Sequence, residues 1–154
     1  MMVVANKNMA EQLERDLERA LEGLFRLGAN RRFDTRQAAE VGAVVTRAGY
    51  AVLRSLHDGG TLSLREVAEA SAMDSPTASR QVVQLEQEGL VERRTAEGDA
   101  RAVELRLTPK GRKVYDKVVQ YRLKVLTRAL SDWSAKDRAD LQRLAGKLAT
   151  DLTR

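Results

Sequence analysis

The chain has 154 residues, enough for one domain with a proper core, and a formal net charge of +5. It contains no Cys and one His, which argues against disulfides, thiol redox sensing and Cys- or His-based metal sites, so we expect no metal and no cofactor. It has no run of about 18 apolar residues and no secretory signal pattern, so we expect a cytoplasmic protein without a membrane segment.

The positive charge is concentrated toward the C-terminal end. Residues 113–154 hold 10 Lys or Arg and 5 Asp or Glu, whereas residues 1–59 hold 9 and 8, and residues 60–112 hold 8 and 9. Because the central segment is close to neutral, bulk charge does not by itself indicate nucleic-acid binding. Any such function depends on where individual cations are placed.

The first predicted element is a long amphipathic helix from Met9 to about Gly28. Its apolar residues recur at helical spacing and form one stripe, with charged residues on the opposite side. The stripe consists of Leu13, Leu17, Leu21, Leu24 and Leu27. Because it needs an apolar partner, we expect it to pack against a later part of the chain or against a second subunit.

Two shorter helices are predicted to lead into the central segment. One lies around residues 33–41, and Thr46 is a suitable N-cap for the other, which ends at His57-Asp58-Gly59-Gly60. We interpret His57 as a favourable partner of the helix dipole rather than a ligand. Thr61 and Leu62 are expected to form a short third strand against a later hairpin.

Two helices separated by a tight turn come next. Ser63 and Glu66 have the spacing of a capping box, and Ser75 followed by Pro76 predicts the start of the second helix, which closes at Gly89. Its inward stripe is apolar. Its outward side carries Thr77, Ser79, Arg80, Gln81 and Gln84. Hydroxyls, an Arg and amides on one exposed side suit a helix that lies in a DNA major groove and bonds base edges.

A β-hairpin follows the second helix. Residues 91–95 and 103–107 alternate with a period of two on either side of a loop at Glu97-Gly98-Asp99-Ala100. This pattern predicts two strands with one buried face.

The remaining chain is predicted to form a long helix that starts at Thr108-Pro109 and a last helix that starts at Ser134. Trp133, between them, is interpreted as a packing anchor, and the tyrosines at 50, 115 and 121 as core or interface residues. The long helix has two apolar stripes, which need two partners. They consist of Val114, Val118, Tyr121 and Val125, and of Val119, Leu123, Leu126 and Leu130.

The order of these elements predicts a mainly α fold with a small β-hairpin, arranged as a winged helix-turn-helix. Residues 46–111 would form the winged helix-turn-helix. Residues 1–45 and 112–154 would form a helical dimerisation region, because the terminal helices carry surplus apolar surface.

Three spaced motifs resemble the MarR (multiple antibiotic resistance regulator) family of transcription regulators. They are Leu85-Glu86-x-x-Gly89-Leu90-Val91-Glu92-Arg93, then Asp99-x-Arg101, then Leu107-Thr108-Pro109-Lys110-Gly111. The resemblance covers roughly residues 46–112, and several motifs in the right order are more specific than a single helix-turn-helix pattern. The chain departs from the family pattern at Ala72, where Gly is common in the turn, and at Val83 and Gln84, where acidic and Arg residues are common.

The resemblance implies a reading helix in the major groove and a wing Arg in the minor groove. Arg101 would be the wing residue, with Asp99 orienting it, and Ser63 and Arg65 would contact phosphates. The full set of expected DNA contacts is Ser63, Arg65, Ser75, Thr77, Ser79, Arg80, Gln81, Gln84, Arg94, Asp99 and Arg101. The alternative for Arg80 and Arg94 is a solvated surface cation, and the alternative for Asp99 and Arg101 is a salt bridge at the hairpin tip. A DNA contact is favoured for Arg80 and for the Asp99–Arg101 pair.

Three functions are compatible with this sequence, and none is enzymatic, because no catalytic constellation or phosphate-binding loop is visible. The favoured one is a homodimeric repressor that binds a pseudo-palindromic operator in double-stranded DNA and is released by a small, aromatic effector, as the resemblance implies. A winged helix that binds protein rather than DNA is the alternative, supported by the near-neutral charge of residues 60–112. An RNA-binding winged helix is third, because the reading helix exposes no aromatic residue to stack on bases.

Overall fold

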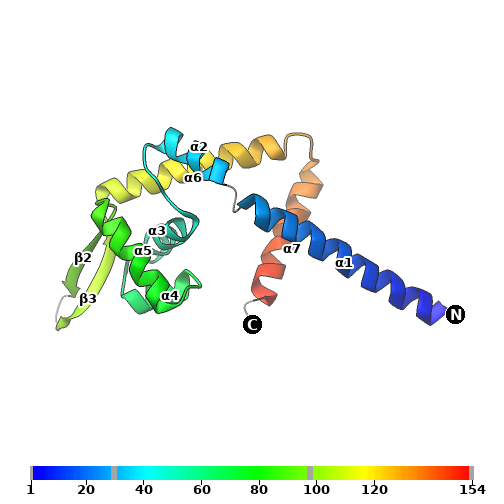
Figure 1. Ribbon diagram of the computed structural model, residues 1–154, viewed down its shortest axis with the longest axis horizontal. Coiled ribbons are helices and arrows are strands. Elements are labelled where there is room, and N and C mark those ends of the chain that lie inside the picture. Colours follow the sequence, from blue (N-terminus) through cyan, green and yellow to red (C-terminus); the bar gives the residue numbers. More distant parts are fainter. Residues whose placement is uncertain (1, 29–30, 97–98, 153–154) are drawn as a thin grey trace. The chain divides into compact units, whose positions relative to one another are not determined.

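A computed structural model of the chain describes residues 2–28, 31–96 and 99–152, as Figure 1 shows. Within these ranges it leaves out the side chains of residues 2–8, 10, 27, 28, 31, 32, 34, 96 and 99–102. The chain forms two compact units, Met1–Arg47 and Ala48–Arg154, which are described separately below.

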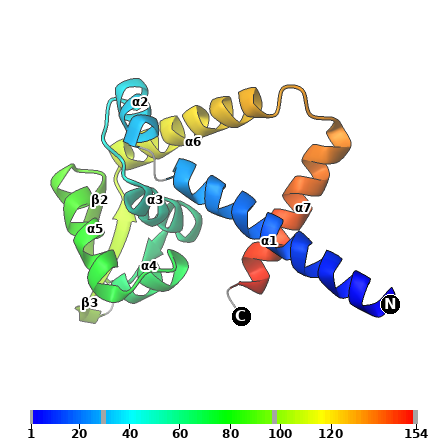
Figure 2. The same cartoon turned by 45° about the vertical axis from the view of Figure 1, so that its right-hand side comes forward.

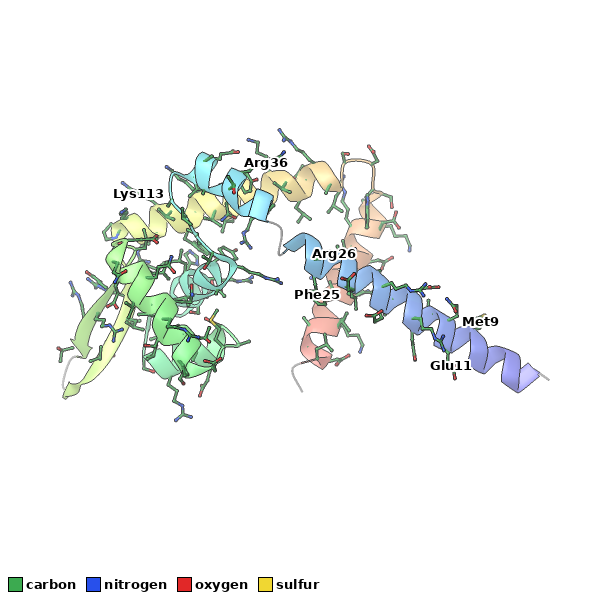
Figure 3. The ribbon with its side chains drawn as sticks, in the orientation of Figure 1. Met9, Glu11, Phe25, Arg26, Arg36 and Lys113 are labelled. Atoms are coloured by element: carbon green, nitrogen blue, oxygen red, sulfur yellow. The ribbon has the colours of Figure 1, made fainter. Side chains whose placement is uncertain are left out.

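The first unit contains the helices α1 (Met2–Gly28) and α2 (Arg31–Val41), so both predicted helices are confirmed, and α1 begins earlier than Met9. Among the stripe residues of α1, Leu13 is 69% exposed, and Met9 and Phe25, labelled in Figure 3, are exposed as well. After α2 the chain turns at Gly42, where φ is +76°, and the Gln37 amide donates to the Val45 carbonyl oxygen at 3.2 Å. Three leucines of the stripe, Leu13, Leu17 and Leu24, are therefore exposed to solvent.

The second unit holds the winged helix-turn-helix and the two C-terminal helices. Its elements are α3 (Arg47–Gly59, which begins at the last residue of the first unit), β1 (Thr61–Leu62), α4 (Leu64–Ala70), α5 (Ser75–Gln87), β2 (Val91–Ala96), β3 (Asp99–Leu107), α6 (Pro109–Ala129) and α7 (Ala135–Asp151). Helices thus dominate and a small sheet accompanies them, which confirms the expected fold class. None of the helices within residues 2–28, 31–96 and 99–152 is long and apolar enough to cross a lipid bilayer.

The sheet is antiparallel and has the strand order β1-β3-β2. Leu62 pairs with Leu105, which confirms the predicted third strand. Asp99 and Ala100 already belong to β3, so their assignment to the hairpin loop was wrong. The register shifts between Thr95 and Ala96, and a shift of this kind strengthens the local twist of a hairpin.

One apolar core joins the helices of the winged part to the sheet. Its fully buried large members are Val52, Leu53, Leu56, Val67, Val82, Leu90, Leu105 and Val118. Val91, Leu105 and Leu107 are buried at the base of the hairpin, whereas Val103 is 49% exposed. The predicted buried face of the hairpin is therefore right at its base and wrong toward its tip, because the tip extends beyond the helices that cover the base.

The contact between α3 and α6 is aromatic. The His57 ring stacks on Tyr115 with 4.3 Å between centroids, and Tyr50 stacks on the same tyrosine at 5.8 Å. The Arg122 guanidinium carbon lies 3.8 Å from the Tyr50 ring centroid, within range of a cation–π interaction. His57 lies in the last turn of α3, where the dipole interpretation placed it, and its main additional role is packing.

The two apolar stripes of α6 have different environments. Val114, Val118 and Tyr121 of the first stripe are buried, whereas Leu126 of the second is 51% exposed. On α7, Leu144 is 52% exposed, and the helix has no buried residue within its described length. The Trp133 indole is 45% exposed, so it is not a packing anchor within a single chain.

Candidate nucleic-acid interface

The helix-turn-helix consists of α4 and α5, which lie side by side next to the sheet in Figures 1 and 2. The N-terminus of α4 is fixed by the predicted capping box. The Glu66 N–H donates to the Ser63 hydroxyl oxygen at 3.3 Å, while the Ser63 N–H and hydroxyl both donate to Glu66 Oε2 at 2.7 Å. The Ser63 backbone bond is the largest cause that lowers the pKa of the Glu66 carboxyl. Ser63 therefore already has a structural role, whatever contact it makes with DNA.

The turn between the two helices contains a left-handed residue. Ser71 ends α4, and Ala72 follows with φ of +51°. The Met73 N–H then donates to the Ala68 carbonyl oxygen at 2.9 Å, which is the hydrogen bond that closes a helix end of this kind. This geometry gives the physical reason for the Gly that is common here in the resembled family, since Gly adopts a positive φ without steric cost.

A residue that the sequence analysis passed over starts the reading helix. Asp74 is the N-cap of α5, and Ser75 is the first residue inside the helix rather than its cap. The Thr77 N–H donates to Asp74 Oδ1 at 2.7 Å, and the Thr77 hydroxyl donates to Asp74 Oδ2 at 2.9 Å. These bonds, the backbone one foremost, lower the pKa of Asp74. An Asp directly before Ser75-Pro76 was the signal that could have identified this N-cap, because Asp is a preferred residue at that position.

Arg80 extends the same hydrogen-bonded chain along the helix. Its Nη2 donates to Thr77 Oγ1 at 3.1 Å, so the hydroxyl links the helix cap to the guanidinium. Arg80 is exposed, and the Thr77 hydroxyl, which is itself bonded to Asp74, holds its guanidinium group. A cation with a fixed starting position loses less side-chain entropy when it binds than one that is free in solvent.

The outward face of α5 includes more than the five residues predicted for it. Arg80, Val83 and Gln87 are exposed and recur at three- and four-residue spacing, opposite the buried residues Ala78 and Val82. Val83 and Gln87 were not predicted as contacts. Their position around the helix, on the side opposite the apolar stripe, was the signal that could have identified them. An exposed valine on this face suits contact with a thymine methyl group.

The other predicted residues of this face are less open. Thr77, Ser79, Gln81 and Gln84 are half-buried, and the Gln84 amide donates to Glu88 Oε1 at 3.3 Å. They lie toward the flanks of the helix or are held by neighbouring residues. Direct readout by α5 would therefore centre on Arg80.

The end of α5 is fixed by residues that lie about 20 positions later. Gly89 has φ of +71°, and its carbonyl oxygen accepts from the Thr108 hydroxyl at 2.7 Å. The Lys110 ammonium donates to the Glu88 carbonyl oxygen at the same distance. A Cβ atom on Gly111 would lie 1.9 Å from the Leu90 carbonyl oxygen, so no larger residue fits there. The Thr-Pro-Lys-Gly motif thus connects the start of α6 to the end of the reading helix.

The outer face of the hairpin carries paired charges. In the strand register Glu92 faces Arg106, and Arg94 faces Glu104. The Arg106 Nε donates to Glu92 Oε1, and the Arg94 Nε lies 3.6 Å from the same oxygen. Arg106 was not predicted as a contact, and period-two alternation from Glu92 and Arg94 was the signal that could have found it. The side chains of Asp99 and Arg101 lie outside the described residues, so the wing-tip contact stays a prediction.

Arg65, the remaining predicted contact, lies on the exposed side of α4. Its Nε is 2.9 Å from Glu69 Oε1, one turn along the helix, and this hydrogen bond is the main cause that raises the pKa of Arg65. Exposed pairs of this type are weak, so a phosphate can replace the carboxylate at small cost.

Comparison with known proteins agrees with this geometry. Residues 45–103 match the sequence model of the MarR family. The chain is 27% identical over 140 residues to the HTH-type transcriptional repressor MdtR of Bacillus subtilis, covering 91% of this chain and 88% of that protein.

Two solved structures extend the comparison to the fold. The YusO protein of Bacillus subtilis is 28% identical, with a TM-score of 0.66 and coverage of 92% of this chain and 97% of the other. BpsR of Bordetella bronchiseptica, whose DNA binding is regulated by 6-hydroxynicotinic acid, is 26% identical, with a TM-score of 0.58 and coverage of 77% and 94%.

Proposed function

Because this chain belongs to the MarR family of transcription regulators, we propose that it is a homodimeric repressor that binds a pseudo-palindromic operator in double-stranded DNA. Membership of this family confirms the expectation of a DNA-binding regulator rather than an enzyme. The observation that carries the proposal is the outward face of α5, where the Asp74–Thr77–Arg80 chain holds an exposed cation beside the wing. Such a face suits the major groove, and the hairpin beside it suits the adjacent backbone.

A dimer is proposed because the terminal helices carry more exposed apolar surface than a monomer needs. Leu126 on α6 and Leu144 on α7 are each about half exposed, as is much of the stripe on α1. A two-fold axis through a helical dimerisation region, formed by residues 1–45 and 112–154, would place two copies of α5 one DNA turn apart, about 34 Å. The repressor role follows from the similarity to MdtR.

We further propose that a small aromatic effector releases the operator, and that the protein works in the cytoplasm. The similarity to BpsR, whose DNA binding 6-hydroxynicotinic acid regulates, supports an effector of this chemistry. A cleft of about 840 Å³ lies between α3 and α4, and its lining includes the apolar residues Ala51, Leu62 and Ala70 and the charged residues Arg54, Asp58, Glu66 and Glu69. This volume is sufficient for a molecule with one or two aromatic rings.

Selection of bound sequences from a random DNA pool tests DNA binding, palindromy and dimer spacing together. We expect an inverted repeat whose half-sites are centred about 10 base pairs apart. The Arg80→Ala variant should lose preference at one position of each half-site, while Arg143→Ala, on α7, should select the wild-type sequence.

The same selection distinguishes the alternative function. A pool that shows no enrichment and no binding at 50 mM salt would contradict the proposal. It would favour a winged helix that binds another protein, which the near-neutral charge of residues 60–112 makes the next candidate.

A further inference from the structure

Several cations of the winged part are paired with carboxylates. Arg65 pairs with Glu69 at 2.9 Å, and Arg93 pairs with Glu86 at 2.7 Å. Residues 60–112 as a whole hold 9 acidic and 8 basic residues, so this segment has no excess of positive charge for phosphate binding. Some of the carboxylates that balance its cations are therefore in direct contact with them.

Glu92 differs from Glu69 and Glu86 because it interacts with two cations. Its Oε1 accepts the hydrogen bond from Arg106 across the strand pair and lies 3.6 Å from the Nε of Arg94 on its own strand. All three side chains share the outer face of the hairpin, whose opposite face is apolar and buried at its base. The half-buried carboxylate therefore lies beside two guanidinium groups, that of the half-buried Arg106 and that of the exposed Arg94.

Resting on the proposed function, we propose that Glu92 is a specificity-determining residue that restrains the wing cations from binding DNA that lacks the operator. Two effects act together. The carboxylate repels phosphates and has to be displaced before Arg94 or Arg106 can bind them, and this cost applies to every duplex. It also holds both guanidinium groups in one orientation, which helps only when base contacts by α5 fix the wing in one place on the DNA.

On the operator the two effects of the carboxylate oppose each other, whereas on random DNA only the repulsion acts. On random DNA the protein has no fixed register, so orientation gives no advantage and repulsion dominates. On the operator the benefit of orientation offsets part of the repulsion. Removal of the carboxylate should therefore strengthen binding to random DNA more than binding to the operator.

Glu92→Gln tests this inference, because it keeps the size of the side chain and removes its charge. Binding is measured by fluorescence anisotropy from 50 to 200 mM salt, on a random-sequence duplex and on the duplex that the wild-type protein selects. For random DNA we expect an affinity gain of about threefold, as for the loss of one negative charge some 7 Å from a phosphate in water. The salt slope should steepen by about one unit, and the ratio of operator to random affinity should fall.

Three further variants separate local charge from other causes. Asp132→Asn, in the turn between α6 and α7, removes the same charge elsewhere and should leave both affinities near their wild-type values. Glu92→Asp keeps the carboxylate and should keep the wild-type slope. Glu92→Thr removes the charge with a residue that favours strands, so it replaces Glu92→Gln if that variant melts at a lower temperature.

Equal changes on both duplexes, or a random-DNA slope that matches that of Asp132→Asn, would overturn the role of Glu92. If the wild-type protein binds neither duplex at 50 mM salt, the proposed function itself fails. The two failures are therefore distinguishable in one data set.

Discussion

At the scale of single residues, the helix-turn-helix depends on a few backbone and capping contacts. Ala72 is the non-glycine residue with a positive φ among those that the structure describes. Ser71, just before it, has a buried hydroxyl oxygen without a hydrogen-bond partner in the described structure. The turn between α4 and α5 thus combines an unpaired hydroxyl group with a strained backbone conformation.

Ala72→Gly should stabilise the protein. A left-handed conformation costs a residue with a Cβ atom about 1–2 kcal/mol, and the extra unfolded-state entropy of Gly offsets about half of this gain. We expect a net gain of about 0.5–1 kcal/mol and a melting temperature about 2–3 °C higher. Ala139→Gly, in the middle of α7, is the control and should lower stability by about 1 kcal/mol. A lower melting temperature for Ala72→Gly would contradict the strain at this turn.

The caps of α4 and α5 predict sensitivity to acid. The pKa values of Glu66 and Asp74 are lowered from ordinary values of 4.5 and 3.8, chiefly by backbone hydrogen bonds from Ser63 and Thr77. Because the folded-state pKa is the lower one, each carboxylate contributes its stability in full above its unfolded value. This contribution is lost as the pH falls below about 4.5 and through the folded pKa.

Thermal melts between pH 7 and pH 2.5 test this dependence. The double variant Glu66→Gln, Asp74→Asn keeps side chains that can cap a helix but removes both titrations. Its melting temperature should fall less steeply below pH 4.5 than that of the wild type. Superimposable pH curves would show that these caps do not govern acid stability.

At the scale of elements, the reading helix is coupled to α6 through one junction. Thr108 and Lys110 bond the carbonyl oxygens at the end of α5, and Gly111 lets the first turn of α6 approach the Leu90 carbonyl. Figure 1 shows α6 beginning beside this end of α5. A change in the direction of α6 would therefore be transmitted to the reading helix at this point.

Gly111→Ala should disrupt this junction. The added Cβ would lie 1.9 Å from a backbone oxygen, and neither helix can move without losing the hydrogen bonds around it. We expect a loss of about 3 kcal/mol or more and a melting temperature lower by roughly 10 °C. Gly146→Ala is the matched control, because nothing lies within 4 Å of its Cβ position, and it should stabilise α7 by about 0.5–1 kcal/mol. A melting temperature for Gly111→Ala within about 2 °C of the wild type would refute the steric argument.

For the whole molecule, the exposed apolar stripes are the main feature that disfavours a monomer, because they leave apolar side chains in contact with water. Leu123 and Leu126 of the second stripe of α6 and the described leucines of α7 other than Leu148 are exposed, while the core of the winged part is buried. Stripes that remain exposed on helices with ordinary caps favour burial against a second copy of the chain.

Leu126→Lys and Leu144→Lys should weaken self-association. A buried lysine without a partner costs about 2–4 kcal/mol at an interface, which corresponds to a dimer dissociation constant about 30- to 1000-fold higher. Light scattering after size exclusion should show a dimer for the wild type and for Lys136→Gln, a control on the polar side of α7. Operator affinity should fall along with the dimer. If both variants stay dimeric at micromolar concentration, the two stripes are not the interface.

Features that depend on neighbouring residues could be predicted from the amino-acid sequence. Hydrogen bonds and periodicities within a few positions explain four of them. These are the capping box at Ser63, the start of α6 at Thr108, the strand alternation and the order of the elements. The same local reasoning found Arg80 on the exposed side of α5 but left out Val83 and Gln87. These two residues lie further round the helix from its apolar stripe than some residues that were included.

The contacts between residues far apart in the chain became known from the folded structure. The strand register brings Arg106 to Glu92, 14 residues away, and chain reversal brings Thr108 to Gly89. Packing also selects which stripe of α6 is buried, although both have the same spacing. These outcomes depend on contacts between segments that are distant in the chain. Charge counts and periodicity do not say which of these segments meet.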